Sequence, residues 1–166
     1  MGKFRLGFWV GIAGLATIMI VGGKTVWMAA LMYGLILGLL SGTDHSIKTA
    51  QQGLRFGLIN GAVAGAVMLV GQLLRSLWLD PLAGQTQLSL GLGAFGSALV
   101  AGLIGLVIAA AAAGLLAASQ HLPGTQRTVA VAAIAGAYLL FLPQLDKALG
   151  LAWLGDIIPI LIFVIL

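Results

Sequence analysis

The feature that most constrains this chain is an apolar run from Leu88 to Ala118 that contains no charged side chain. About 20 apolar residues are enough for a helix to cross the roughly 30 Å hydrocarbon core of a bilayer. Other apolar runs approach this length, and none alternates in polarity as the strands of a barrel do. Only 7% of all residues are charged, against about 25% in soluble domains. The sequence therefore predicts an all-α, polytopic transmembrane helical bundle.

Polar loops, glycines and prolines divide the chain into about five complete helices and the start of a sixth. Asp80-Pro81 predicts a break after the third helix, because the residue before a proline avoids the helical conformation. Pro143 is expected to end the fifth helix, and Asp146, Lys147 and Asp156 are expected in the loop that follows. Residues 1–166 are predicted to form a single transmembrane region. The predicted helices span Leu6–Gly22, Val26–Leu40, Gly53–Leu74, Leu88–Ala118 and Val129–Leu142, with the sixth beginning near Ile157.

The last apolar run, Ile157–Leu166, has about half the length that a membrane crossing needs. We therefore expect this chain to be the N-terminal part of a longer protein. The first apolar run follows Lys3 and Arg5 and resembles a signal peptide, but a second apolar run comes directly after it. We interpret it as an uncleaved first helix.

Basic residues in the loops predict the orientation, since they are more frequent on the cytoplasmic side. A cytoplasmic N-terminus places five basic residues inside and three outside. This count predicts a multi-pass protein of the cell inner membrane with its N-terminus in the cytoplasm. The five are Lys3, Arg5, Lys48, Arg55 and Arg127, and the three are Lys24, Arg75 and Lys147.

Small residues recur at every fourth position in three of the predicted helices. Residues four apart stack along one face of a helix, and small residues allow helices to pack closely in lipid. We expect these faces to be helix-packing surfaces, and a glycine-lined pore or an oligomer interface is the alternative. The positions are Gly53, Gly57, Gly61 and Gly65 in the third helix, Gly34, Gly38 and Gly42 at the end of the second, and Gly105, Ala109, Ala113 and Ala117 in the fourth.

Asn60 and Gln72 are the polar side chains within the third predicted helix. Asn60 is expected to form an intramembrane hydrogen bond to a neighbouring helix, and a contact with a substrate is the alternative. Arg55 and Lys24 lie near helix ends and are expected to reach the lipid headgroups.

No residue pattern predicts catalysis, a metal site or a cofactor site. The acid and imidazole candidates are Asp44-His45 and His121, which lie in predicted loops without an evident nucleophile and orienting partner. The chain has two histidines and neither cysteine nor glutamate, a composition that does not favour a metal site. Its scattered basic residues are typical of topology signals rather than of nucleic-acid binding. We predict that the chain is not an enzyme.

The C-terminal stretch LPQLDKALG, followed by LGDIIPILIFVIL, resembles the segment that leads into the core of branched-chain amino acid ABC transporter permeases. The resemblance covers about the last 25 residues, 142–166. It implies a membrane-embedded permease subunit of an importer for branched-chain amino acids or similar small solutes. It also implies an ATP-binding subunit, a second permease subunit and a solute-binding protein as partners. The family's coupling loop carries a glutamate, which this chain lacks, so no functional residue is transferred. The alternative is a small glycine-zipper membrane protein that acts as a structural or accessory subunit of a larger complex.

Overall fold

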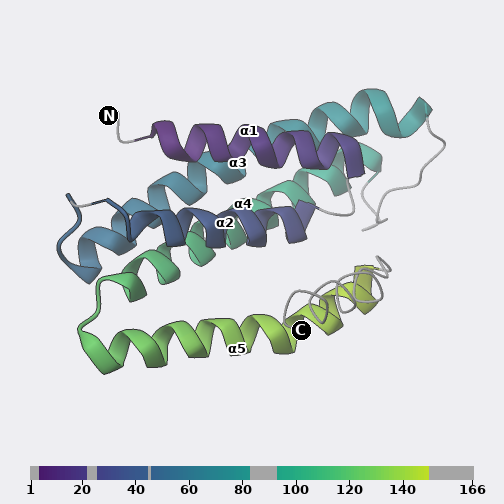
Figure 1. The fold of residues 1–166 in the computed structure, drawn as a ribbon. Helices are drawn as coiled ribbons and strands as arrows, with labels where there is room; N and C mark the ends of the chain where they lie inside the picture. Colours follow the sequence, from purple (N-terminus) through teal and green to yellow (C-terminus); the bar gives the residue numbers. More distant parts are fainter. Residues whose placement is uncertain (1–3, 22–25, 45, 83–92, 150–166) are drawn as a thin grey trace, which may run out of the picture. The chain divides into compact units, whose positions relative to one another are not determined.

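The computed structural model describes residues 4–21, 26–44, 46–82 and 93–149, and the regular structure within these ranges is entirely helical (Figure 1). The prediction of an all-α chain is confirmed. The helices are α1 (Arg5–Val21), α2 (Val26–Ser41), α3 (Ala50–Leu82), α4 (Ala94–Gln120) and α5 (Gly124–Leu149).

The contacts divide the chain into two compact units, Met1–Val131 and Ala132–Leu166. The first unit contains α1 to α4 and the first turns of α5. The second contains the remainder of α5. This helix begins at Gly124, directly after Pro123. The candidate site lies in the first unit.

Two long helices, α3 and α4, run antiparallel and form the centre of the first unit. Gly53 lies opposite Ala117, and twelve residues further along α3 Gly65 lies opposite Leu106. The helix α2 packs on α4 in the parallel direction, since Gly34 faces Ala109 and, one turn further along both helices, Gly38 faces Ala113. Both relations are visible in Figure 1.

The helix α1 packs on α3, also in the parallel direction, because Gly7 faces Asn60 and Gly14 faces Met68. The hydroxyl groups of Thr17 and Tyr33 lie 2.8 Å apart and join α1 to the antiparallel α2. Consecutive helices from α1 to α4 therefore alternate in direction, as short connections favour.

The core of the first unit combines a few large side chains with many alanines. Fully buried alanines on α2, α3 and α4 keep these helices close together, and Ile18, Leu37 and Met68 fill the remaining space. The buried cluster consists of Ile18, Val26, Ala29, Ala30, Leu37, Ala64, Met68, Ala101, Ala109 and Ala113.

The predicted end of the third helix at Leu74 is wrong, because α3 continues to Leu82. Arg75 lies inside the helix, where its guanidinium binds carbonyl groups of α1. The expected break at Asp80-Pro81 falls within the last turn of α3, one residue before its end. The fourth helix begins at Ala94, and residues 88–92 of its predicted span lie outside the described residues.

The predicted fifth helix is too short at both ends. It begins at Gly124, and it continues past Pro143 to Leu149. A proline removes one backbone donor from a helix, and α5 accommodates this loss without ending. Asp146 and Lys147 therefore lie in α5 rather than in a loop. Gly150, Asp156 and the sixth helix predicted from Ile157 lie outside the described residues.

Among the described residues, two helices are long and apolar enough to cross a membrane, Ala50–Leu79 within α3 and Phe95–Gln120 within α4. The helices α1 and α2 are also apolar, with 17 and 16 residues respectively. These lengths lie at the lower limit of about 17 residues for a helix that crosses a bilayer, where local thinning of the bilayer accommodates the short span.

Candidate functional site

The glycine face of α3 lies directly against the backbone of α4. A Cβ atom built on Gly53 would lie 2.6 Å from the carbonyl oxygen of Ala117, and one built on Gly61 would lie 2.5 Å from that of Ala109. At Gly65 the same atom would lie 2.6 Å from the Cα of Leu106. At Gly57 it would overlap the carbonyl oxygen of Ala113. Only hydrogen fits at these four positions, so α3 and α4 touch backbone to backbone over more than three turns.

The glycines of α2 also pack against Ala109 and Ala113 of α4. A Cβ atom on Gly34 would lie 2.7 Å from the Ala109 carbonyl oxygen, and one on Gly38 would lie 2.6 Å from the Cβ of Leu116. Gly42 lies one residue beyond α2, and its nearest neighbour from another helix is the side chain of Gln120, at 3.4 Å. Ala109 and Ala113 thus contact both α2 and α3. Gly105, by contrast, has ordinary contacts of 3.4 Å and more with Val26 and Ala30.

A third glycine contact joins α1 to α3, and the sequence analysis did not predict it. Gly7, Gly11 and Gly14 each lie so close to α3 that an added Cβ would meet Asn60, Ala64 or Met68. The spacing of four between Gly7 and Gly11 is the signal that could have indicated it. The next spacing is three, which ends the regular repeat.

Asn60 is 1% exposed and joins α3 to the start of α1. Its Oδ1 accepts a hydrogen bond of 2.9 Å from the backbone N–H of Gly7, and its Nδ2 donates to the carbonyl oxygen of Phe56 at 3.0 Å. The first N–H groups of a helix have no partner within the helix. Asn60 therefore supplies the acceptor that the N-terminus of α1 needs.

Arg75 supplies the matching contact at the other end of α1. It is 7% exposed, and its Nη1 donates hydrogen bonds to the carbonyl oxygens of Ile18, at 3.1 Å, and of Met19. The last carbonyl groups of a helix also lack partners, and a cation is favourable at the negative end of the helix dipole. We call Asn60 and Arg75 together the α1 clamp. Both ends of α1 are thus stabilised by side chains of α3.

Two buried polar atoms have no hydrogen-bond partner among the described residues, Oε1 of Gln72 and Nε2 of His121. Gln72 is 2% exposed and lies one turn before Arg75 on α3. His121 ends α4, and its ring lies against Gly53. A buried amide oxygen without a partner reduces stability, so Gln72 is a position where an apolar residue would be favourable.

The acid and imidazole candidates do not form a catalytic arrangement in the described part of the chain. Oδ1 of Asp44 accepts a hydrogen bond from the backbone N–H of Ser46 at 2.9 Å, which stabilises the turn after α2. Ser41 donates to the carbonyl oxygen of Gly38, so its hydroxyl is engaged within its own helix. His45 lies outside the described residues. The described residues contain no group of three His, Cys, Asp or Glu side chains that could hold a metal ion.

Comparison with protein families, with curated proteins and with solved structures finds no match to this chain. Functional conclusions therefore depend on the geometry of the four helices and on the chemistry of their exposed surface. That geometry provides close backbone packing and a helix held at both ends.

Proposed function

We propose that this chain is a multi-pass membrane protein in which α1 to α4 form a scaffold packed through small residues. The observation that supports this proposal is the set of exposed apolar side chains that recur along α1 and α3, here called the hydrophobic band. Exposed apolar surface of this extent is typical of a membrane or protein interface. The band includes Phe8, Trp9, Ile20, Leu58, Ile59, Val70, Leu74, Leu77 and Trp78.

The length of this band matches the thickness of a bilayer. Gly7 faces Asn60, so Arg5 lies level with about residue 58 of α3. From there to Trp78 is about 20 residues, or roughly 30 Å along a helix, which is the thickness of the hydrocarbon core. Arg5 stands at one boundary and Trp78, which is 71% exposed, at the other. Basic and aromatic residues are typical of both boundaries.

The basic residues support a cytoplasmic N-terminus in the cell inner membrane. Two of the three assigned to the outer side, Arg75 and Lys147, lie within α3 and α5 rather than in connections, so Lys24 alone of the three keeps its place in the count. In this orientation the α2–α3 connection with Lys48 faces the cytoplasm and the α3–α4 connection faces outward. The hydrophobic band is then in contact with membrane lipid.

Within the membrane, we propose a role as a permease subunit of an ABC importer for branched-chain amino acids or similar small solutes. The resemblance of residues 142–166 supports this role. Such a subunit acts with an ATP-binding subunit, a second permease subunit and a solute-binding protein. The helices α3 and α4 would form part of the structural scaffold rather than line the solute pathway. Their backbones leave no room for a solute at the four glycines of α3, which are spaced four residues apart.

The second candidate is a structural or accessory subunit of a larger membrane complex. The same backbone contact between α3 and α4 favours it, since a rigid packed module is what an accessory subunit supplies. The two candidates share the membrane location and differ in whether solute uptake depends on the chain.

Extraction of cell membranes tests the location. The full chain, expressed with a small epitope tag, should remain in the membrane pellet after washing with alkaline carbonate and should be released by detergent. Release by carbonate alone would refute the membrane proposal.

Uptake of radiolabelled leucine distinguishes the two roles. Cells that lack the native gene should show reduced energy-dependent uptake, and expression of the intact protein should restore it. Normal uptake in those cells, with the protein in the membrane of the parent strain, would exclude the permease role and support the accessory role.

A further inference from the structure

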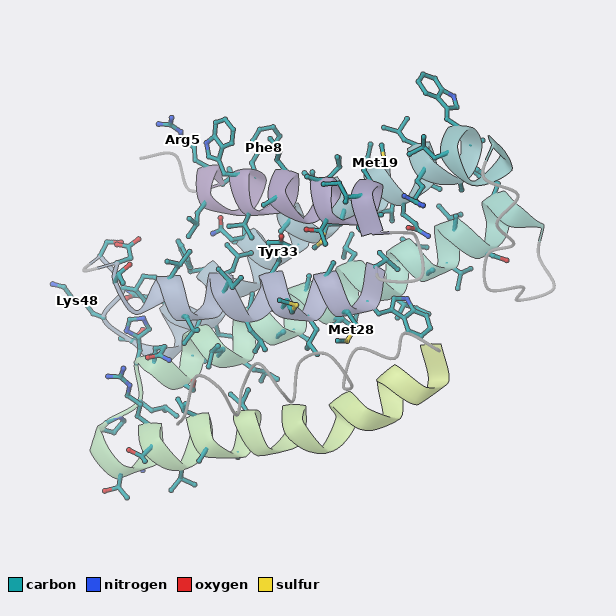
Figure 2. The ribbon with its side chains drawn as sticks, turned by 45° about the vertical axis from the view of Figure 1, so that its right-hand side comes forward. Arg5, Phe8, Met19, Met28, Tyr33 and Lys48 are labelled. Carbon is teal, nitrogen blue, oxygen red and sulfur yellow. The ribbon has the colours of Figure 1, made fainter. Side chains whose placement is uncertain are left out.

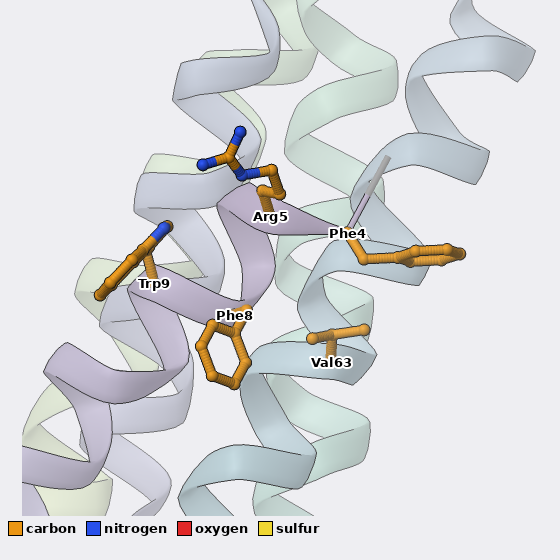
Figure 3. A pocket seen from close by; sticks show the side chains of 5 residues that line it. All are labelled: Phe4, Arg5, Phe8, Trp9 and Val63. Atoms are coloured by element: carbon orange, nitrogen blue, oxygen red, sulfur yellow. The ribbon is translucent and has the colours of Figure 1, made fainter. Parts of the chain in front are cut away.

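A hollow of about 410 Å³ lies on the surface where the start of α1 meets α3 (Figure 3). Its lining is aromatic and aliphatic except for one cation. Phe4, Arg5, Phe8 and Trp9 come from the beginning of the chain, and Val63 comes from α3. The rings of Phe8 and Trp9 meet edge to face, with centroids 6.0 Å apart, which holds both rings in place.

The cation of this hollow is available to a ligand. Arg5 is exposed, and its guanidinium has no hydrogen bond or ion pair to any other described residue. Figure 3 shows the guanidinium pointing away from the ring of Phe8, with Phe8 and Val63 on the opposite side. The hollow therefore has one charged end and one apolar end.

The charged end lies at the end of the bundle that carries the α2–α3 connection. The contact between the hydroxyl groups of Thr17 and Tyr33 shows which residues of α1 and of the antiparallel α2 lie at the same height along the bundle. Arg5 lies twelve residues before Thr17, or about 18 Å along α1. Ser41, the last residue of α2, lies eight residues after Tyr33, or about 12 Å in the same direction. Figure 2 agrees, since Arg5 and Lys48 lie at one end while Met19 and Met28 lie towards the other.

We propose that this hollow binds an anionic phospholipid. The phosphate pairs with the guanidinium of Arg5, and the upper part of one acyl chain lies on Phe8 and Val63. A guanidinium binds phosphate oxygens through paired, charge-assisted hydrogen bonds, and the aromatic rings suit the boundary between headgroups and acyl chains. A zwitterionic lipid gains less, because its own ammonium group competes for the phosphate. This inference depends on the membrane location proposed above.

Quenching of Trp9 fluorescence by brominated lipids tests the proposal. Replacing the other three tryptophans, Trp27, Trp78 and Trp153, by phenylalanine leaves Trp9 as the single tryptophan in the full chain, so that excitation selective for tryptophan reports on Trp9 alone. The protein is reconstituted in phosphatidylcholine vesicles that contain brominated phosphatidylglycerol or brominated phosphatidylcholine. A basic residue near an anionic surface contributes about 1 kcal/mol, so phosphatidylglycerol should be preferred about fivefold at this site. Circular dichroism confirms that the substituted chain remains helical.

The controls separate this site from general attraction to anionic lipid. Arg5→Gln should reduce the preference to about one, and Arg5→Lys should retain most of it. Arg55→Gln removes the same charge from another exposed position at the start of α3, outside the hollow, and should leave the preference unchanged. A preference that survives Arg5→Gln, or that Arg55→Gln removes equally, would overturn the proposal.

Two further outcomes show whether the lipid site alone or also the proposed membrane location is wrong. Equal quenching by both brominated lipids would overturn the anionic-lipid site and leave the membrane proposal standing. Quenching by neither lipid would overturn both proposals together. Loss of the preference on adding millimolar inorganic phosphate, at constant ionic strength, would show that free phosphate competes with the lipid, and would support pairing of the lipid phosphate with the guanidinium of Arg5.

Discussion

At the scale of single residues, the missing side chain of Gly57 allows the backbones of α3 and α4 to meet. Its hydrogen atom faces the Ala113 carbonyl oxygen, and the Cα of Gly114 lies 2.7 Å from where a Cβ would be. In lipid, apolar surface gives no net drive for helices to associate, so close van der Waals contact carries much of the stability. A single methyl group at this position therefore acts on the whole interface.

Gly57→Ala should lower the free energy of unfolding by about 1–3 kcal/mol, because the added methyl group forces α3 away from α4. Gly105→Ala is the matched control, since the space beside it accepts a methyl group. It should be neutral or stabilising by up to about 1 kcal/mol, as alanine is the better helix former. Unfolding in detergent micelles, followed by circular dichroism, measures both. Equal effects of the two substitutions would contradict the close contact at Gly57.

Asn60 and Gln72 allow a second paired test, because both amide side chains are buried on α3. The amide oxygen of Asn60 accepts a hydrogen bond, whereas that of Gln72 has no partner among the described residues. Asn60→Leu removes the acceptor for the Gly7 N–H and should destabilise the protein by about 1 kcal/mol. Gln72→Leu removes an oxygen that has no partner among the described residues, and should be neutral or stabilising. The same unfolding measurement applies. A loss of stability for Gln72→Leu as large as that for Asn60→Leu would show that Gln72 has a partner.

Residue spacing predicted which face of α3 carries the small residues, but it could not predict what lies opposite. The partner of Gly57 is 56 residues away in the sequence, at Ala113, and no local pattern links the two. The sequence places Arg75 in the connection after Leu74, in the segment that leads to Asp80-Pro81. Its partners, the last carbonyl groups of α1, become visible only after the chain has folded.

At the scale of elements, α1 is a short helix that depends on a longer one. Its apolar length is marginal for a membrane crossing, and the α1 clamp satisfies backbone groups at both of its ends. The helix α3 extends eight residues beyond its predicted end, and Arg75 lies at the start of that extension. The added length is therefore the part of α3 that holds the end of α1.

Arg75→Met should loosen the last turn of α1 while leaving α4 unchanged. The substitution removes a cation from the negative end of the α1 dipole, a contribution of about 1–2 kcal/mol in a partly buried site. Amide hydrogen exchange in detergent should therefore become faster near Ile18 and Met19. Arg55→Met is the control, since Arg55 is exposed and should leave exchange in α1 as it was. Unchanged exchange in Arg75→Met would mean that the clamp does not stabilise α1.

At the scale of the whole chain, the alternating directions of α1 to α4 place the C-terminal ends of α2 and α3 at opposite ends of the first unit. In the membrane orientation proposed above, the connections that follow these two helix ends lie on opposite sides. The basic residues favour a cytoplasmic α2–α3 connection.

Single cysteines test this arrangement cleanly, because the chain has none of its own. Gln85→Cys, between α3 and α4, should react with an impermeant maleimide in intact cells. Ser46→Cys, between α2 and α3, should react only after the membrane is made permeable. The reverse pattern would invert the orientation, and labelling of both positions in intact cells would contradict a crossing by α3.

The α1 clamp has a consequence for how the protein is made. Arg75 follows Met19 by 56 residues, and a ribosome adds about 5–20 residues per second, so α1 emerges roughly 3–11 s before the side chain that completes its C-terminal end. During this interval the carbonyl groups of Ile18 and Met19 lack the guanidinium of Arg75 as a partner. The C-terminal end of α1 therefore reaches its final hydrogen bonding only after α3 has been synthesised.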